Sequence, residues 1–291
     1  MPNQFYLNNS SLPILACSMQ YNYRVVKGLK PPPGGNKYTP LGLAFHQAIQ
    51  HKAEKKVDNL SLLLLLDSKS ALIPPRLAAL TNEADRLHIG MMADRVYNEY
   101  QSIYADCKTE HEFVSTSPDD AGLPVTPLRA GTIDLLSYDA QAERLDVIDY
   151  KTTSKPIDGQ LFRNYQLSAQ RWYYMAGLQL IADSLPDHYR DAINSARFGF
   201  RYIYVSMVKP ETVIQPPSLV DINELNAFRR QFAEKAYLAS HLHADESLAV
   251  REGILSGLCW KCPFANICAG VYTEDSWPYG RAPYTHKHDN E

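Results

Sequence analysis

The stretch LDVIDYKTTSK, residues 145–155, ends an apolar run with an acidic and a basic residue. Successive side chains of a β-strand point to opposite faces, so Asp149 and Lys151 share one face with Val147. The simplest interpretation is an exposed edge strand whose polar face meets water. The alternative is a strand that presents a carboxylate and an ammonium group to a common partner, and the neighbouring sequence favours it.

A second β-like run, AGTIDLLSYD, residues 130–139, lies just upstream and carries Asp134 between two apolar residues. The short polar connection DAQAER is typical of a hairpin with a longer loop. Two adjacent antiparallel strands would bring Asp134, Asp149 and Lys151 close together.

This trio of side chains suits one kind of chemistry. Hard divalent cations such as Mg²⁺ and Mn²⁺ prefer carboxylate and carbonyl oxygens, so Asp134 and Asp149 are candidate metal ligands, with the main-chain carbonyl of Tyr150 as a further one. Lys151 is then expected to orient or deprotonate the attacking water and to offset charge on a phosphate. The predicted reaction is hydrolysis of a phosphodiester.

The order G-x-x-D, short loop, hydrophobic-D-Y-K-T resembles the core of the PD-(D/E)XK nuclease superfamily. The resemblance implies that Asp134 is the first acid, Asp149 the second and Lys151 the lysine of that core. It also implies an α/β fold with a mixed central β-sheet flanked by helices, as in restriction endonucleases.

A histidine precedes the two acids in LGLAFHQAIQHKAEKK, residues 41–56, which predicts an amphipathic helix with Leu43, Ile49 and Ala53 facing inward. A lone histidine on a helix is more often a packing or surface residue than a ligand. The spacing from Gly42 to His46 is similar to the histidine motif of the RecB-like branch, which implies that His46 assists the metal.

A glutamine motif follows the lysine in YQLSAQRWYYMAG, residues 165–177, which predicts one helix. RecB-like nucleases carry Q-x-x-x-Y here, and the resemblance implies Gln166 as the glutamine, with Gln170 one turn further along. The alternative register pairs Gln170 with Tyr174, and the sequence leaves both open. A helix face that packs only in the core is the structural alternative.

The cysteines form the most specific pattern, because CWKCPFANIC places Cys259, Cys262 and Cys268 at C-x2-C-x5-C, with Cys17 far upstream. Taken alone this spacing indicates zinc. The set resembles the RecB/AddB-like iron–sulfur branch, closest to the CRISPR-associated "Cas four" type exonucleases, and implies four thiolates on one [4Fe–4S] cluster that joins the N- and C-terminal segments. Cys107 falls outside the pattern.

Composition is compatible with one nuclease domain over residues 1–291, with 45% hydrophobic residues and a formal net charge of −3. No apolar run reaches membrane-spanning length, and the leucine-rich segment 60–66 predicts a buried helix. The low net charge argues against a protein that coats nucleic acid by bulk electrostatics and leaves a local basic path. The candidate residues of this path are Arg24, Lys27, Lys30, Lys52, Lys55 and Lys56. The expected parts of the domain are an N-terminal arm (1–40), a helical insertion or lid (60–106), the nuclease core (110–215, with strands near 110–117, 124–137 and 145–151) and a cluster segment (250–275).

The resemblance implies a cytoplasmic, metal-dependent DNA exonuclease that prefers single-stranded ends and uses Mg²⁺ or Mn²⁺. Recombination, repair, phage replication and CRISPR adaptation are the implied pathways, with their proteins as partners. Two alternatives remain open. One is a catalytically inactive, nuclease-derived module that binds DNA or a partner, and the other is a nuclease stapled by zinc.

Overall fold

The structure, a computed structural model, describes residues 4–7, 14–32, 39–116, 121–166, 168–209, 211–250, 259 and 262–281. The chain divides into two compact units. The first unit comprises Met1–Gly34, Phe113–Gly131 and Asn223–Glu291, and the second comprises Gly35–Glu112 and Thr132–Ile222. The candidate acids belong to the second unit and the four motif cysteines to the first.

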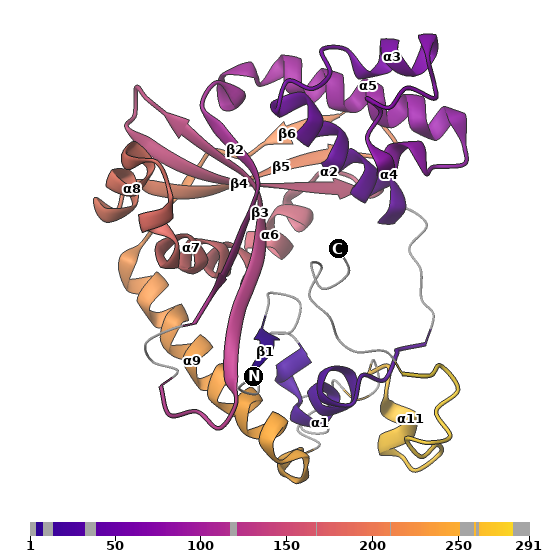
Figure 1. Ribbon diagram of the computed structural model, residues 1–291, viewed down its shortest axis with the longest axis vertical. Coiled ribbons are helices and arrows are strands. Elements are labelled where there is room, and N and C mark those ends of the chain that lie inside the picture. Colours follow the sequence, from indigo (N-terminus) through magenta and orange to yellow (C-terminus); the bar gives the residue numbers. More distant parts are fainter. Residues whose placement is uncertain are drawn as a thin grey trace. The chain divides into compact units, whose positions relative to one another are not determined.

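A mixed β-sheet is the framework of the chain (Figure 1). Its strands within the described residues are β1 (Gln4–Leu7), β2 (Cys107–Ser115), β3 (Thr126–Asp139), β4 (Arg144–Thr153), β5 (Phe198–Ser206), β6 (Thr212–Ile214) and β7 (Ser218–Leu219). They follow the order β1-β3-β4-β5-β6, while β2 pairs with β3 and β7 with β5. β4 is antiparallel to β3 and parallel to β5. The predicted strands are confirmed with small shifts of their ends.

β4 carries most of the stretch LDVIDYKTTSK, and it lies inside the sheet between β3 and β5. Its residues from Leu145 to Tyr150 are all buried. The interpretation as an exposed edge strand is therefore wrong, and Asp149 is buried from solvent with only 2% of its surface exposed.

Helices of the second unit cover the sheet. Those before β2 are α2 (Thr39–Ala53), α3 (Leu60–Leu66), α4 (Pro75–Ala78), α5 (Glu83–Glu99) and the 3₁₀ turn η3 (Gln101–Tyr104). Those between β4 and β5 are α6 (Gly159–Gln166), α7 (Gln170–Leu180), the turn η5 (Ala182–Ser184) and α8 (Asp187–Asn194). Phe45 of α2 and Ile89 of α5 share one apolar core with Ile148 of β4. The segment from α6 to α8 makes the crossover that two parallel strands require.

The inward face of α2 differs in part from the prediction. Ile49 and Ala53 are buried as expected, but Leu43 is 45% exposed. Ala44 and Phe45 lie in the core in its place, so the buried face of α2 is rotated by about one residue relative to the predicted face.

The leucine run of α3 is amphipathic instead of buried all round. Leu60 and Leu64 are buried, whereas Leu65 and Leu66 are 67% and 77% exposed. Because α3 packs on α5 through only one face, the buried positions recur four residues apart.

A buried ion pair holds the start of α3 against α5. Lys52 is 1% exposed, and its Nζ lies 2.8 Å from Asp94 Oδ1 and donates to the carbonyl of Asp58. Asp94 also accepts hydrogen bonds from the main-chain N–H groups of Leu60 and Ser61, at 2.9 and 2.8 Å. The expectation that Lys52 joins a basic path for DNA is therefore wrong.

The first unit joins segments from the beginning and the end of the chain. Its further elements are the turn η1 (Ile14–Ala16), α1 (Ser18–Tyr21), the π-helical turn η2 (Asn22–Val26), α9 (Ile222–Ala244, which begins one residue before the unit boundary), the turn η6 (Glu246–Leu248) and α11 (Ala265–Cys268). Lys27 Nζ lies 3.0 Å from Glu246 and 2.6 Å from Glu274, and Trp277 Nε1 donates to the carbonyl of Lys30. Lys27 is thus already paired within the protein. No helix of the described residues has the length and apolar character to span a membrane.

We expect Asp94→Ala to lower the free energy of unfolding by about 3–5 kcal/mol, because it leaves the buried Lys52 ammonium without its counter-charge. Urea unfolding followed by circular dichroism measures the change. Glu99→Ala is the matched control on the same helix, since its partner Arg95 is 47% exposed, and we expect an effect below about 1 kcal/mol. Equal losses of unfolding free energy in the two variants would show that the buried Lys52–Asp94 pair contributes no more to stability than an exposed pair.

Candidate active site

The two acids lie where β3 and β4 stop pairing. The antiparallel ladder runs from Asp139 opposite Arg144 to Leu135 opposite Ile148. Beyond that last pair, the main-chain N–H of Tyr150 donates to Asp134 Oδ2 at 3.0 Å. A carboxylate thus takes the position of a strand partner, which draws the side chain of Asp134 toward β4.

Asp149 is held by two side chains from different elements. Its Oδ2 lies 2.5 Å from Lys151 Nζ, and its Oδ1 accepts a hydrogen bond from Gln170 Nε2 at 2.8 Å. The same Gln170 amide lies 3.0 Å from the hydroxyl oxygen of Tyr174. The structure therefore brings the second register of the glutamine motif to the acid. The expected single helix over 165–177 is two helices, because α6 ends at Gln166 and α7 begins at Gln170. The side chain of Gln166 lies outside the described part of the structure.

His46 contacts the other acid, with its Nδ1 at 3.3 Å from Asp134 Oδ2. Burial acts to lower the pKa of His46, but the charge of Asp134 outweighs it, and the pKa is raised. Burial acts to raise the pKa of Asp134, and the charges of His46 and Lys151 outweigh this effect, so the pKa is lowered. The positions of these two groups therefore stabilise each other's charged forms.

Asp149 differs from Asp134 in its electrostatics. Burial, together with the nearby charge of Asp134, raises the pKa of Asp149 to about 6 in spite of the Lys151 ammonium. Burial acts to lower the pKa of Lys151, but both carboxylates outweigh it and raise the pKa. A carboxylate with a perturbed pKa next to a second carboxylate is typical of a functional site.

Aromatic rings surround the lysine. Lys151 Nζ lies 5.5 Å from the ring centroid of Tyr165 and 5.7 Å from that of Tyr202, within the range of cation–π attraction. The sequence analysis missed both tyrosines. The alternating run FGFRYIYVS indicates a strand, but the register that places Tyr202 of β5 opposite Asp149 of β4 joins distant segments and left no signal in the sequence.

A close approach of α2 to β4 positions the histidine. A Cβ atom on Gly42 would lie 2.6 Å from Thr152 Oγ1, much closer than ordinary van der Waals contact. A larger residue at position 42 would therefore force the Thr152 hydroxyl to move or the helix to withdraw from the strand. His46 follows one turn later on the same helical face, which gives the Gly-x-x-x-His spacing a physical reason.

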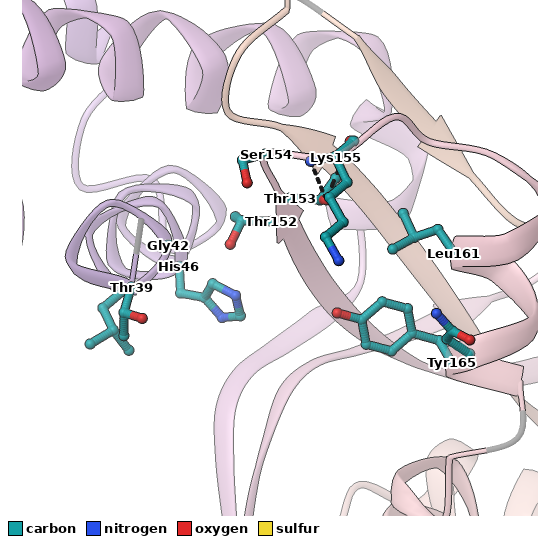
Figure 2. Close-up of a pocket in the computed structure, with 11 residues that line it drawn as sticks. Thr39, Gly42, His46, Thr152, Thr153, Ser154, Lys155, Leu161 and Tyr165 are labelled. Atoms are coloured by element: carbon teal, nitrogen blue, oxygen red, sulfur yellow. Dashed lines mark hydrogen bonds between the residues drawn. The ribbon is translucent and has the colours of Figure 1, made fainter. Parts of the chain in front are cut away.

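A cavity of about 500 Å³ opens beside the acids. Figure 2 shows the ring of His46 on the α2 side of this cavity, with Lys155 and Tyr165 on the opposite side. Thr152 and Ser154 lie between them, at the end of β4. The site therefore has space for a substrate next to its charged groups.

The oxygen atoms of the two acids fit a hard divalent cation. Asp149 Oδ2 is buried and accepts no hydrogen bond of good geometry, with the Lys151 ammonium as its close charged neighbour. In the part of the chain that the structure describes, no group of three or more His, Cys, Asp or Glu side chains is arranged to hold a metal ion. Mg²⁺ commonly uses one or two carboxylates and completes its shell with water and substrate phosphate. The role of the Tyr150 carbonyl as a ligand stays a prediction.

All four motif cysteines belong to the first unit. None of them is in a disulfide bond, and the main-chain N–H of Cys262 donates to the carbonyl of Cys259 at 3.1 Å, which closes the C-x2-C turn. Burial raises the pKa of the Cys262 thiol, and the charges of Cys268, Cys17 and Cys259 raise it further. The other three motif cysteines thus lie near enough to Cys262 to influence its pKa, while Cys107 belongs to β2 of the second unit.

Comparison with known proteins identifies the family of the chain. The family model of the PD-(D/E)XK nuclease superfamily matches residues 14–269, and the chain belongs to this superfamily. Members of the superfamily are typically nucleases that act on DNA and use Mg²⁺ or Mn²⁺. No curated protein matches. Among solved structures, a crystal structure of SSO0001 is similar at 14% identity with a TM-score of 0.34, covering 93% of this chain and 88% of that one.

The contact between Gly42 and Thr152 predicts that the effect of Gly42→Ala on stability has opposite signs in the wild-type protein and in the Thr152→Ala variant. Alanine in a helix is favoured over glycine by about 1 kcal/mol, whereas overpacking costs about 1–3 kcal/mol. We therefore expect Gly42→Ala to destabilise the wild-type protein and to stabilise the Thr152→Ala variant, in which the clashing Oγ1 is absent. Thermal unfolding of the four proteins in this cycle measures both effects. The same sign in both backgrounds would show that the contact does not limit the approach of α2.

Proposed function

We propose that this protein is a metal-dependent DNA exonuclease that hydrolyses phosphodiester bonds and prefers single-stranded ends. The observation that carries the proposal is the buried cluster of Asp134, Asp149 and Lys151, whose two acids are contacted by His46 and Gln170. Membership of the superfamily supports the nuclease activity. The preference for ends and the implied roles in recombination, repair, phage replication or CRISPR adaptation rest on the resemblance of the motifs.

Asp134 and Asp149 are the proposed ligands of Mg²⁺ or Mn²⁺. When bound, the cation would polarise the phosphate and make water a stronger nucleophile. His46 and Gln170 hold the two carboxylates in fixed orientations, which keeps the reacting geometry from depending on mobile side chains. The Lys151 ammonium offsets negative charge that develops on the phosphate oxygens, and its buried position strengthens this effect.

Aromatic side chains support a single-stranded substrate. Tyr165 flanks Lys151 and lines the cavity, where a base can reach its ring, whereas Tyr202 is buried behind it. Unpaired bases stack on such rings whatever their sequence, whereas the bases of a duplex are already stacked on one another.

We also propose that Cys17, Cys259, Cys262 and Cys268 hold a [4Fe–4S] cluster, a cofactor that four thiolates suit. The absence of disulfide bonds among them and the effect of the other three on the pKa of Cys262 support the proposal. The cluster would act as a structural staple of the first unit, and no catalytic step requires it. Zinc is the alternative occupant, and colour distinguishes the two, since an iron–sulfur protein is brown and a zinc protein is colourless.

Removal of the charge of either Lys151 or Asp149 is expected to abolish DNA cleavage almost completely. Lys151→Ala and Asp149→Asn should each leave less than about one thousandth of the native rate, because groups of this kind contribute several kcal/mol to the transition state. End-labelled DNA incubated with Mg²⁺, Mn²⁺ or chelator measures the rate. Mg²⁺ at roughly 100 times its dissociation constant should stabilise the wild-type protein by about 3 kcal/mol and Asp149→Asn by much less. Cleavage at the native rate by either variant would contradict the assignment.

The proposed preference for ends predicts a difference between linear and circular substrates. A linear single strand should be degraded at least about tenfold faster than a closed circle of the same sequence, because only the linear strand can enter the cavity by an end. Gel analysis of both strands over time measures the difference. Equal rates would indicate an endonuclease.

Loss of one motif cysteine should remove the cluster without removing the chemistry. We expect anaerobically purified Cys268→Ala to lose its brown colour, iron and sulfide, and to lose stability by up to about 5 kcal/mol, by analogy with a cross-link that closes a long loop. Cys107→Ala is the matched control and should keep the brown colour, the iron and the sulfide. Folded Cys268→Ala protein should still cleave DNA at low temperature. A folded, metal-loaded variant without activity would show that the cluster has a direct part in substrate handling.

A further inference from the structure

Among the described residues that line the cavity of the second unit there are basic and hydroxyl groups and no acidic group. It adjoins the acid and lysine cluster through two shared side chains. His46 Nδ1 lies 3.3 Å from Asp134 Oδ2, and the Tyr165 ring lies 5.5 Å from Lys151 Nζ. A molecule in this cavity therefore lies next to the reacting groups without displacing them.

A hydrogen-bonded turn presents Lys155 at the wall of the cavity. The hydroxyl of Thr153 accepts a hydrogen bond from the main-chain N–H of Lys155 at 3.0 Å and donates to the carbonyl of Lys155 at 3.3 Å (Figure 2). Lys155 itself is exposed, and no carboxylate of the described residues forms an ion pair with it. Lys27 and Lys52, by contrast, are both paired inside the protein. The Lys155 ammonium is therefore available to an anion from outside.

We propose that this cavity is the subsite for the nucleotide next to the scissile phosphate, and that Lys155 binds the outer phosphate of that nucleotide. The inference rests on the proposed nuclease function and adds a binding subsite to it. The volume of about 500 Å³ falls within the roughly 300–1,000 Å³ of small-ligand sites. Hydroxyl groups of Thr152 and Ser154 and the ammonium of Lys155 suit phosphate oxygens. Leu161 and Tyr165 supply an apolar and aromatic wall for the sugar and base.

Lys155 is in this proposal a substrate-binding residue that takes no part in the chemical step. Lys155→Gln should raise KM for a single-stranded oligonucleotide about tenfold, as expected for one lost charge-assisted contact, with kcat within about twofold. The slope of log affinity against log salt should become shallower by about 0.7, the value for one phosphate of a single strand. Lys155→Arg should keep the native KM. Lys69→Gln, which removes an exposed charge from the loop between α3 and α4, is the matched control and should change neither.

Binding of thymidine 3′,5′-bisphosphate in the presence of chelator tests the cavity without catalysis. Wild-type protein, Lys155→Arg and Lys69→Gln should bind this probe with similar dissociation constants by calorimetry, and Lys155→Gln about tenfold more weakly. If the wild-type protein does not cleave DNA, the proposed nuclease function fails, and this measurement still decides the subsite.

Two results would overturn the subsite. The first is a Lys155→Gln variant with the same KM and the same bisphosphate affinity as Lys69→Gln, because the ammonium would then bind no phosphate. The second is a loss confined to kcat, because Lys155 would then act in the chemical step.

Discussion

The burial of two carboxylates side by side is the constraint on which the second unit depends. Asp134 and Asp149 lie at the end of the β3–β4 ladder, where Asp149 is buried and the side chain of Asp134 is only 14% exposed, so water reaches them little. Isolated charges in such a place are strongly unfavourable, so each acid needs partners that arrive from elsewhere in the chain. Lys151 reaches Asp149 from the same strand, whereas His46 and Gln170 come from helices on either side in the sequence.

This requirement explains where two helices lie. α2 must approach β4 closely enough for His46 to reach Asp134, and Gly42 opposite Thr152 makes that approach possible. α7 begins at Gln170, whose first-turn amide reaches Asp149. The break between α6 and α7 assigns the contact with Lys151 and the contact with Asp149 to two different helices. α6 carries Tyr165 to Lys151 and the cavity, and α7 carries the amide to the acid.

Local patterns in the sequence were sufficient to predict the three central strands and the acids and lysine that they carry, because strand periodicity and hairpin spacing are short-range properties. Contacts between distant segments were not predictable in the same way. Lys52 is buried because Asp94 pairs with it, and Tyr202 lies near Lys151 because of the register between β4 and β5. The outward position of Leu43 depends on which side of α2 meets the sheet.

The cavity and the acid cluster share two side chains. These shared side chains determine at which positions a substitution can change substrate binding without changing the chemical step. His46 lines the cavity and contacts Asp134, and Tyr165 lines the cavity and flanks Lys151. A substitution at either position changes the surroundings of a charged reacting group together with the shape of the cavity, so its kinetic effect mixes the two. Lys155 differs from both, because its turn is closed by its own hydrogen bonds with Thr153. Its charge can be removed while the buried cluster keeps its partners, which makes it the position where substrate binding is separable from catalysis.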